Sequence, residues 1–198
     1  MLIVNLISYS ITNNLIAFRI IALVIVVQGL FEISKALFLN KTPKSFSILS
    51  IGIYAILSFG FLMFTNLEPS IMVWTYLSIF LFDGFSQLSG QLFGKNSLAP
   101  NISPNKTIEG VLGGLVVTLS TLFFLDHISG FSHWESIGMG LLVCLGALVG
   151  DLLASLVKRR CGIKDYGKIL PGHGGILDRF DSFLFGGALM YAFLQLGF

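Results

Sequence analysis

The residues best suited to phosphate chemistry lie in one polar stretch, KRRCGIKDYGKILPGHGGILDRFDS, which runs from Lys158 to Ser182. Within these 25 residues there are six lysines and arginines and three aspartates. An anchor on the inner face of a membrane would need only the cations, which leaves the aspartates unexplained. Phosphate chemistry explains both signs, since Lys and Arg hold phosphates while carboxylates hold Mg²⁺, which prefers oxygen ligands. The stretch therefore indicates a site for a phosphorylated ligand and a metal.

Two further features of this stretch could contribute to such a site. Asp178 and Asp181 are one helical turn apart, so both point to the same place if a helix begins near them. The turn LPGHGG, from Leu170 to Gly175, brings backbone amides within reach of an anion because glycine leaves the backbone open. Such a turn is weak evidence alone, and an isolated His173 is more often a hydrogen-bonded loop histidine than a catalyst.

Two carboxylates within apolar segments are singled out, because ionisable groups inside a membrane usually face a cavity and mark function. Asp83 begins a polar helical face that either lines a substrate cavity or forms a hydrogen-bonded seam between helices. That face continues through Gln87, Gly90, Gln91 and Gly94. Asp151 shares a face with Ser155, Lys158 and Arg159, which suits a functional site better than a structural salt bridge.

A second polar cluster, SPNKTIEG, extends from Ser103 to Gly110. It can be interpreted as the start of a helix with Glu109 in its first turn, in which case Lys106 is only a charge on the inner side. The alternative is that Lys106 contacts a phosphate from a second loop.

The composition places these groups in a membrane protein. The chain has 198 residues, of which 55% are hydrophobic and 11% charged, and its mean hydropathy is +0.87. Soluble domains carry about 25% charged residues. The lipid bilayer is therefore the expected environment, and a net charge of +2 gives no reason to expect nucleic acid as a partner.

Six segments are long and apolar enough to suggest spanning helices, which need about 20 residues. They are Leu15 to Leu39, Phe46 to Phe64, Ile71 to Phe93, Gly110 to Leu125, Ile137 to Val157, and Ser182 to Phe198. Ten of the twelve Lys and Arg residues fall at the first, third and fifth connections, which the positive-inside rule makes cytoplasmic. We predict an all-α, polytopic integral membrane protein of about six transmembrane helices, forming a single membrane domain over residues 1–198. The pairs Gly110 with Gly114 and Gly146 with Gly150 predict close helix packing.

The two polar clusters together resemble the phosphatidate cytidylyltransferase (CDP-diacylglycerol synthase) family. The stretch from Ser155 to Ser182 matches the family's long signature, and SPNKTIEG resembles its second conserved stretch. The matching signature positions are Ser155, Lys158, Arg159, Lys164, Asp165, Gly167, Leu170, Pro171, His173, Gly174, Gly175, Asp178, Arg179 and Asp181. The resemblance covers residues 83–182 and does not extend to the first two spans.

This resemblance implies a nucleotidyltransferase that transfers CMP from CTP to phosphatidate, giving CDP-diacylglycerol and pyrophosphate with Mg²⁺ as cofactor. It places the metal on Asp151 and Asp178. The expected catalytic residues are Asp151, Asp178, Lys158, Arg179, Asp165 and Asp181. The expected substrate-binding residues are Ser103, Lys106, Ser155, Arg159, Lys164, Lys168, His173, Gly174 and Gly175.

The expected location is the plasma membrane, with the active site facing the cytoplasm and a homodimer as a candidate assembly. The sequence leaves three alternative functions open. The acceptor could be another lipid phosphate, such as an archaeal ether lipid. Asp83 and Asp151 could instead line the ion pathway of a transporter, although transport does not require a loop of mixed charge. The third alternative is a catalytically silent scaffold.

Overall fold

The computed structural model describes residues 9–40, 42–167 and 174–197. The long helices are α2 (Leu15–Leu39), α3 (Lys44–Phe64), α4 (Pro69–Phe93), α5 (Ile108–Phe124), α7 (His133–Arg160) and α8 (Leu177–Gln195). A four-residue helix, α6 (Asp126–Ser129), lies between α5 and α7. The six predicted spans correspond to these six long helices, and the prediction of an all-α, polytopic membrane protein is confirmed.

The starts of these helices follow from local sequence. Asn14 caps α2 by accepting from the backbone N–H of Ala17 at 3.1 Å. Ser132 and Glu135 form a reciprocal capping box at the start of α7. Pro69 is the first residue of α4, where its missing N–H costs no hydrogen bond. The starts of α2, α4 and α7 thus follow from neighbouring residues, whereas the N-cap residues of α3 and α8, Pro43 and Ile176, form no side-chain cap hydrogen bond.

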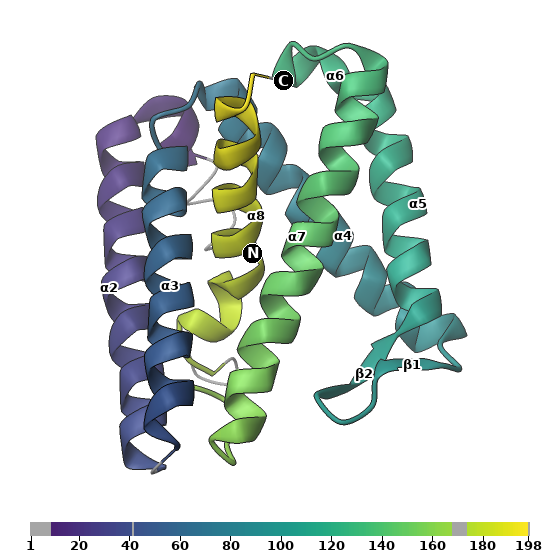
Figure 1. The fold of residues 1–198 in the computed structure, drawn as a ribbon. Coiled ribbons are helices and arrows are strands. Elements are labelled where there is room, and N and C mark those ends of the chain that lie inside the picture. The colour runs from purple at the N-terminus through teal and green to yellow at the C-terminus, as the bar shows by residue number, and fades with distance from the viewer. Residues whose placement is uncertain (1–8, 41, 168–173, 198) are drawn as a thin grey trace.

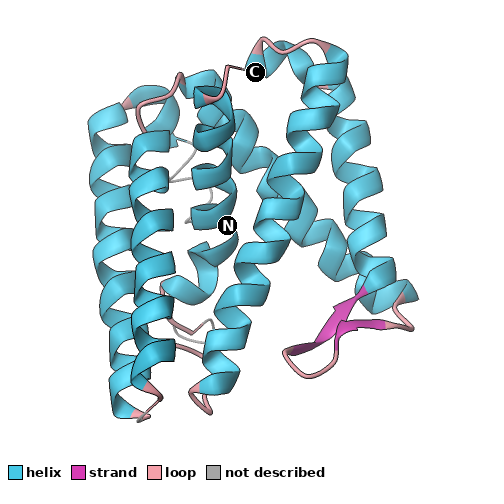
Figure 2. Cartoon of the chain, viewed as in Figure 1, coloured by secondary structure: helices cyan, strands magenta, loops and turns pink. Residues whose placement is uncertain are grey.

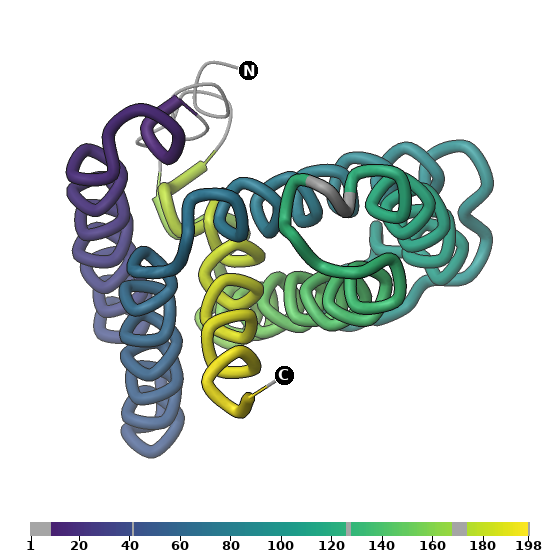
Figure 3. The backbone as a smooth tube through the Cα atoms, turned by 90° about the horizontal axis from the view of Figure 1, so that it is seen from above, coloured from purple at the N-terminus to yellow at the C-terminus, as the bar shows by residue number. Residues whose placement is uncertain are grey.

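The helices run alternately up and down, and the connections fall at two opposite ends (Figure 1). Helix α8 packs against both α3 and α7, while α4 packs along α5. Seen from above, α2 and α3 lie on one side of α8, and α4, α5 and α7 extend on the other (Figure 3). The basic end of α7 lies at the same end of the molecule as the link between α4 and α5 (Figure 1). The fold thus brings the two polar sequence clusters to one end.

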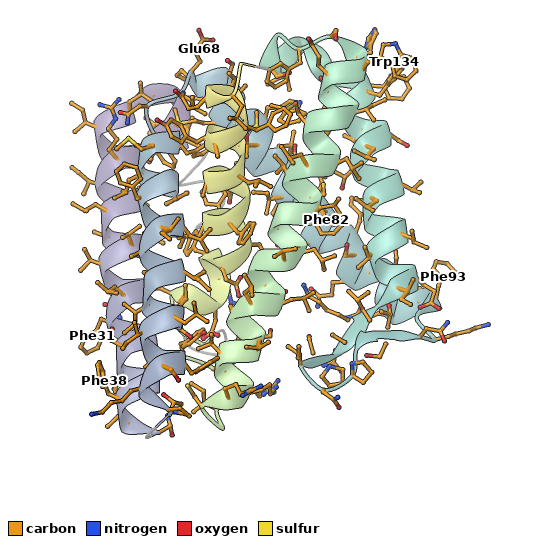
Figure 4. All side chains as sticks on the ribbon, in the orientation of Figure 1. Phe31, Phe38, Glu68, Phe82, Phe93 and Trp134 are labelled. Atoms are coloured by element: carbon orange, nitrogen blue, oxygen red, sulfur yellow. The ribbon has the colours of Figure 1, made fainter. Side chains whose placement is uncertain are left out.

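Four helices, α2, α3, α4 and α7, are long and apolar enough to cross a membrane by length and composition. Helix α5 is shorter at 17 residues, and α8 begins with three charged residues in its first five. Phe31 and Phe38 on α2 point away from the bundle and are 61% and 71% exposed (Figure 4). Exposed phenylalanines of this kind suit contact with lipid. Glu68 and Trp134 lie at the end opposite to the link between α4 and α5 (Figure 4).

A short β-hairpin was not predicted. Strands β1 (Ser97–Ala99) and β2 (Ser103–Thr107) pair antiparallel beside the start of α5 (Figure 2). Glu109 fixes the base of the hairpin by accepting from the backbone N–H groups of Lys95 and Asn96 at 3.1 and 3.2 Å. The expected helix start is nonetheless present, since Thr107 caps α5 through the N–H of Gly110. The rest of SPNKTIEG is strand because its N-terminal half pairs with β1.

The predicted close packing at glycine pairs is confirmed. A Cβ on Gly110 would lie 2.7 Å from the Ser86 carbonyl oxygen of α4, and one on Gly150 would lie 2.8 Å from the Asp181 carbonyl oxygen of α8. Both distances are too short for a side chain, so only glycine allows these helix pairs to approach so closely. Gly150 thereby sets the contact between α7 and α8 that positions the site.

Candidate active site

A polar cavity of about 350 Å³ lies between α4, β2, α5, α7 and α8. Its lining comprises Phe82, Asp83, Ser86, Gln87, Asn105, Lys106, Thr107, Val111, Leu148, Asp151, Asp178, Arg179, Asp181 and Ser182. This volume lies within the range of small-ligand sites. Residues from both polar sequence clusters therefore meet in one cavity.

Lys106 and Asp151 form the first ion pair of the cavity. The Lys106 Nζ lies 2.6 Å from Asp151 Oδ2, and the two side chains are partly exposed. Ser155 Oγ donates to the other oxygen, Asp151 Oδ1, at 3.2 Å. The hairpin delivers Lys106 across the cavity to α7, so Asp151 is held from two directions.

Lys158 and Asp178 form a second and more deeply buried pair. Lys158 Nζ donates to Asp178 Oδ1 at 2.8 Å. The other oxygen, Asp178 Oδ2, accepts the backbone N–H groups of Tyr166 and Gly175, each at 2.8 Å. Three donors from three segments therefore converge on one carboxylate, which is fixed before any ligand arrives.

The charges of the cavity wall favour a cation. Among the described residues that line it there are four aspartates and two cationic residues, Lys106 and Arg179. The Ser86 Oγ is also buried without a hydrogen-bond partner in the described part of the chain. No group of three or more His, Cys, Asp or Glu suited to a metal is found among the described residues. Asp151 and Asp178 nevertheless fit Mg²⁺, which often binds through one or two carboxylates together with water and substrate phosphates.

The sequence of this chain is similar to those of known proteins. A family model described as "Cytidylyltransferase family" matches residues 1–197. The chain belongs to the cytidylyltransferase family. A phosphatidate cytidylyltransferase of Staphylococcus aureus (strain COL) is 39% identical over 173 residues, covering 84% of this chain and 64% of that protein.

Two other relatives of the chain carry similar names. A phosphatidate cytidylyltransferase of Staphylococcus saprophyticus is 37% identical over 178 residues, covering 87% of this chain and 67% of the relative. Phosphatidate cytidylyltransferase 5, chloroplastic, of Arabidopsis thaliana is 43% identical over 124 residues, covering 62% of this chain and 31% of the relative. The chain spans 64% of the length of its Staphylococcus aureus relative.

The predicted site residues differ in where the structure places them. Those that line the cavity are Lys106, Asp151, Asp178, Arg179 and Asp181. Ser155 and Lys158 lie just behind it and bond to Asp151 and Asp178. Lys168 and His173 lie outside the described residues.

Four other predicted residues are not part of the cavity wall. Ser103 begins β2 and pairs with Ala99, while Lys164 and Asp165 are exposed on the connection after α7. Arg159 uses its guanidinium group to hold the hairpin, donating to the carbonyl oxygens of Ile102 and Ile163 at 3.1 and 3.2 Å. In this structure Arg159 therefore joins the two polar clusters.

Gly174 and Gly175 were predicted to approach an anion, and the anion that they meet in the structure is Asp178. The Gly175 N–H donates to this carboxylate. Gly174 has a φ of +84°, and a Cβ there would lie 2.9 Å from Asp178 Oδ2. Glycine is thus required at this position both for its backbone conformation and for the space beside Asp178.

Asp83 and Gln87 line the cavity, which favours the first of the two interpretations of that helical face. The same face becomes a packing seam nearer the end of α4. There, a Cβ on Gly94 would lie 2.7 Å from Thr107 Cγ2. Part of this helical face therefore lines the cavity, and its end packs closely against β2.

Two residues important to the site were missed from the sequence. Tyr166 supplies a backbone donor to Asp178, and its ring lies 5.5 Å from Lys158 Nζ. Burial raises the pKa of Tyr166, whose hydroxyl donates to the Ala154 carbonyl oxygen. Glu32 on α2 binds the start of α8. The rule applied to Asp83 and Asp151, that acids within spans mark function, would also have identified Glu32.

An apolar groove of about 190 Å³ adjoins the polar cavity. Side chains of α3 and α7 supply most of its lining, including the exposed Leu49 and Ile53. Asp181 lines both the groove and the polar cavity. The two spaces thus meet at one carboxylate of α8.

Proposed function

We propose that this protein transfers CMP from CTP to a membrane lipid phosphate, and that phosphatidate is the acceptor. The observation that carries the proposal is the convergence of Lys106 and Asp151 with Lys158 and Asp178 around one cavity. Membership of the cytidylyltransferase family supports the nucleotide, and the names of the relatives support the acceptor. The apolar groove that meets the cavity at Asp181 suits an acyl chain, which further supports a lipid acceptor.

In the proposed reaction, an oxygen of the lipid phosphate attacks the α-phosphorus of CTP. The bond between this phosphorus and the bridging oxygen to the β-phosphate breaks, and pyrophosphate leaves. Lys106, Arg179 and Lys158 would bind and orient the phosphates, because the first two line the cavity and Lys158 contacts the lining residue Asp178. Asp151 and Asp178 would hold Mg²⁺, which when bound neutralises charge on phosphate oxygens. The chain's own contribution is alignment and a fixed electrostatic environment.

The proposed setting is the plasma membrane, with the cavity opening toward the cytoplasm. The basic residues of the hairpin and of the end of α7 lie at one end of the bundle, which suits the cytoplasmic face under the positive-inside rule (Figure 1). CTP would then be available on the side where the cavity opens.

The test is pyrophosphate release by the detergent-purified protein, given CTP, Mg²⁺ and phosphatidate. We expect release only when CTP and phosphatidate are both present, with UTP and an archaeal-type ether-lipid phosphate as parallel arms. Asp151→Asn should abolish release, because Asp151 is one of the two proposed Mg²⁺ ligands. The variant should still fold, because the ion pair that it loses is partly exposed. Glu68→Gln, at the opposite end of the molecule, is the matched control (Figure 4). Release only with the ether-lipid phosphate would show that this lipid, and not phosphatidate, is the acceptor. The absence of release with every combination of nucleotide and lipid phosphate would refute the proposal.

A further inference from the structure

Glu32 is a buried acid on α2 that contacts the segment preceding α8. Its side chain is 2% exposed. Glu32 Oε1 accepts the backbone N–H of Ile176 at 3.0 Å, and Oε2 accepts that of Leu177 at 2.8 Å. Gln28, one turn earlier on α2, donates to Oε1 at 3.4 Å. Both carboxyl oxygens of Glu32 thus accept hydrogen bonds from backbone N–H groups that are 144 and 145 residues away in the sequence.

The start of α8 needs this partner, because it has no cap of its own. The first backbone N–H groups of a helix have no partner within the helix. The residue at the cap position is Ile176, whose side chain has no acceptor, and no side-chain cap hydrogen bond forms there. Glu32 supplies the acceptors from another helix, and its acid group also suits the positive end of the helix dipole.

The sequence around α8 leaves room for this contact. A Cβ on Gly175 would lie 2.6 to 2.8 Å from the three carboxyl atoms of Glu32. A Cβ on Gly167 would lie 3.1 Å from Glu32 Oε1. The absence of side chains at these two positions is therefore what allows the carboxyl group to reach the backbone.

The same turn of the chain carries Asp178. Asp178 follows Leu177 directly, and its carboxylate is bound by the Gly175 N–H and by Lys158. Residues 175–178 therefore lie between two anchors, Glu32 on one side and Lys158 on the other. If the Glu32 anchor is lost, the Ile176 and Leu177 N–H groups are left buried without acceptors, which favours unwinding of the first turn.

We propose that Glu32 is a positioning residue that holds the first turn of α8 so that Asp178 stays in the cavity. The consequence for turnover rests on the proposed cytidylyl transfer, whereas the capping itself does not. The proposal also gives α2 a direct role in the site, although the signature resemblance does not extend to that helix.

The first experiment is hydrogen–deuterium exchange on the full-length, metal-free protein in detergent. We compare the wild type with Glu32→Gln and Glu32→Ala. Gln28→Ala is the matched control, since it removes the neighbouring donor and leaves both backbone contacts. We expect the amides of Ile176 and Leu177 to exchange at least about tenfold faster in both Glu32 variants, and at the wild-type rate in the control. An unchanged exchange rate in the Glu32 variants would overturn the proposal.

The second measurement is turnover per folded molecule, with folded protein counted by size-exclusion chromatography. Loss of a residue that orients a metal ligand typically costs about 10- to 100-fold in metal affinity or activity. We therefore expect kcat to fall by about that factor in Glu32→Gln, with the Mg²⁺ requirement raised and the KM for the lipid phosphate little changed. Lower yield with normal kcat and Mg²⁺ requirement would mean that Glu32 only supports folding. If the wild type itself is inactive, faster exchange would still support the cap, and the proposed function would be the part that fails.

Discussion

The buried pair between Lys158 and Asp178 leads to the most quantitative prediction. Their atoms are 2.8 Å apart, and the side chains are 11% and 5% exposed. In Asp178→Asn, the buried Lys158 ammonium group loses the carboxylate that it contacts. Breaking a buried pair by removing one partner costs about 3–5 kcal/mol. At about 2–4 °C per kcal/mol for a chain of this size, the melting temperature should fall by about 6–20 °C.

The opposite change, Lys158→Met, should be milder. Asp178 would keep the N–H donors of Tyr166 and Gly175, so its carboxylate would still be partly satisfied. The double variant should be more stable than Asp178→Asn alone, because it contains no buried ammonium group. The coupling energy between the two sites should then fall in the range of about 0.5–3 kcal/mol expected for contacting residues.

Thermal unfolding of the four proteins in metal-free detergent solution tests this reasoning. Lys164→Met is the control, since Lys164 is an exposed lysine on the connection after α7. Its melting temperature should match that of the wild type. The pair contributes nothing to stability if the falls in melting temperature of the two single variants add up in the double variant. The same conclusion follows if the melting temperature of Asp178→Asn falls no further than that of the control.

Three further predictions concern other parts of the molecule. Lys106→Met should lower CTP turnover at least about tenfold in initial-rate assays while barely changing the melting temperature, because partly exposed pairs contribute only about 0–1 kcal/mol. Gly114→Leu should cost about 1–3 kcal/mol by overpacking, since a Cβ there would lie 2.9 Å from the Phe82 carbonyl oxygen. Gly138→Leu, where a Cβ meets nothing within 4 Å, should leave the melting temperature unchanged. Burial raises the pKa of Cys161, so less thiolate is present at pH 8 and maleimide labelling followed by mass spectrometry should be slower than for a cysteine peptide.

Hydropathy predicted the long helices well, because each span must present about 20 apolar residues whatever its tertiary contacts. The first span, Leu15 to Leu39, agrees with α2 at both ends. The last was predicted to start at Ser182, whereas α8 starts at Leu177. Its first turn is polar and looks like loop, and it is helical because Glu32 caps it from α2. A cap supplied from a distant helix leaves no local signal.

The hairpin was missed for a related reason. Strands of three and five residues are too short to show a periodic pattern, and β2 contains Pro104. What stabilises the hairpin is tertiary: Glu109 binds its base and Arg159 binds the Ile102 carbonyl oxygen. Residue types alone identified Lys106 and Asp151 as candidates, but only the hairpin explains how the lysine reaches the aspartate.

The two ion pairs bring charges of both signs together at the cavity. Each carboxylate proposed to hold the metal, Asp151 and Asp178, is bound by a lysine in the structure, Lys106 and Lys158 respectively. Asp178 is the more deeply buried of the two, and the Lys158 ammonium group offsets part of the cost of burying its charge. In the proposed reaction, Lys106 and Lys158 would bind phosphate oxygens, and Asp151 and Asp178 would hold the metal. Cations alone would bind phosphates but offer no oxygen ligand for the metal, and carboxylates alone would repel the phosphates, so such a site needs both signs.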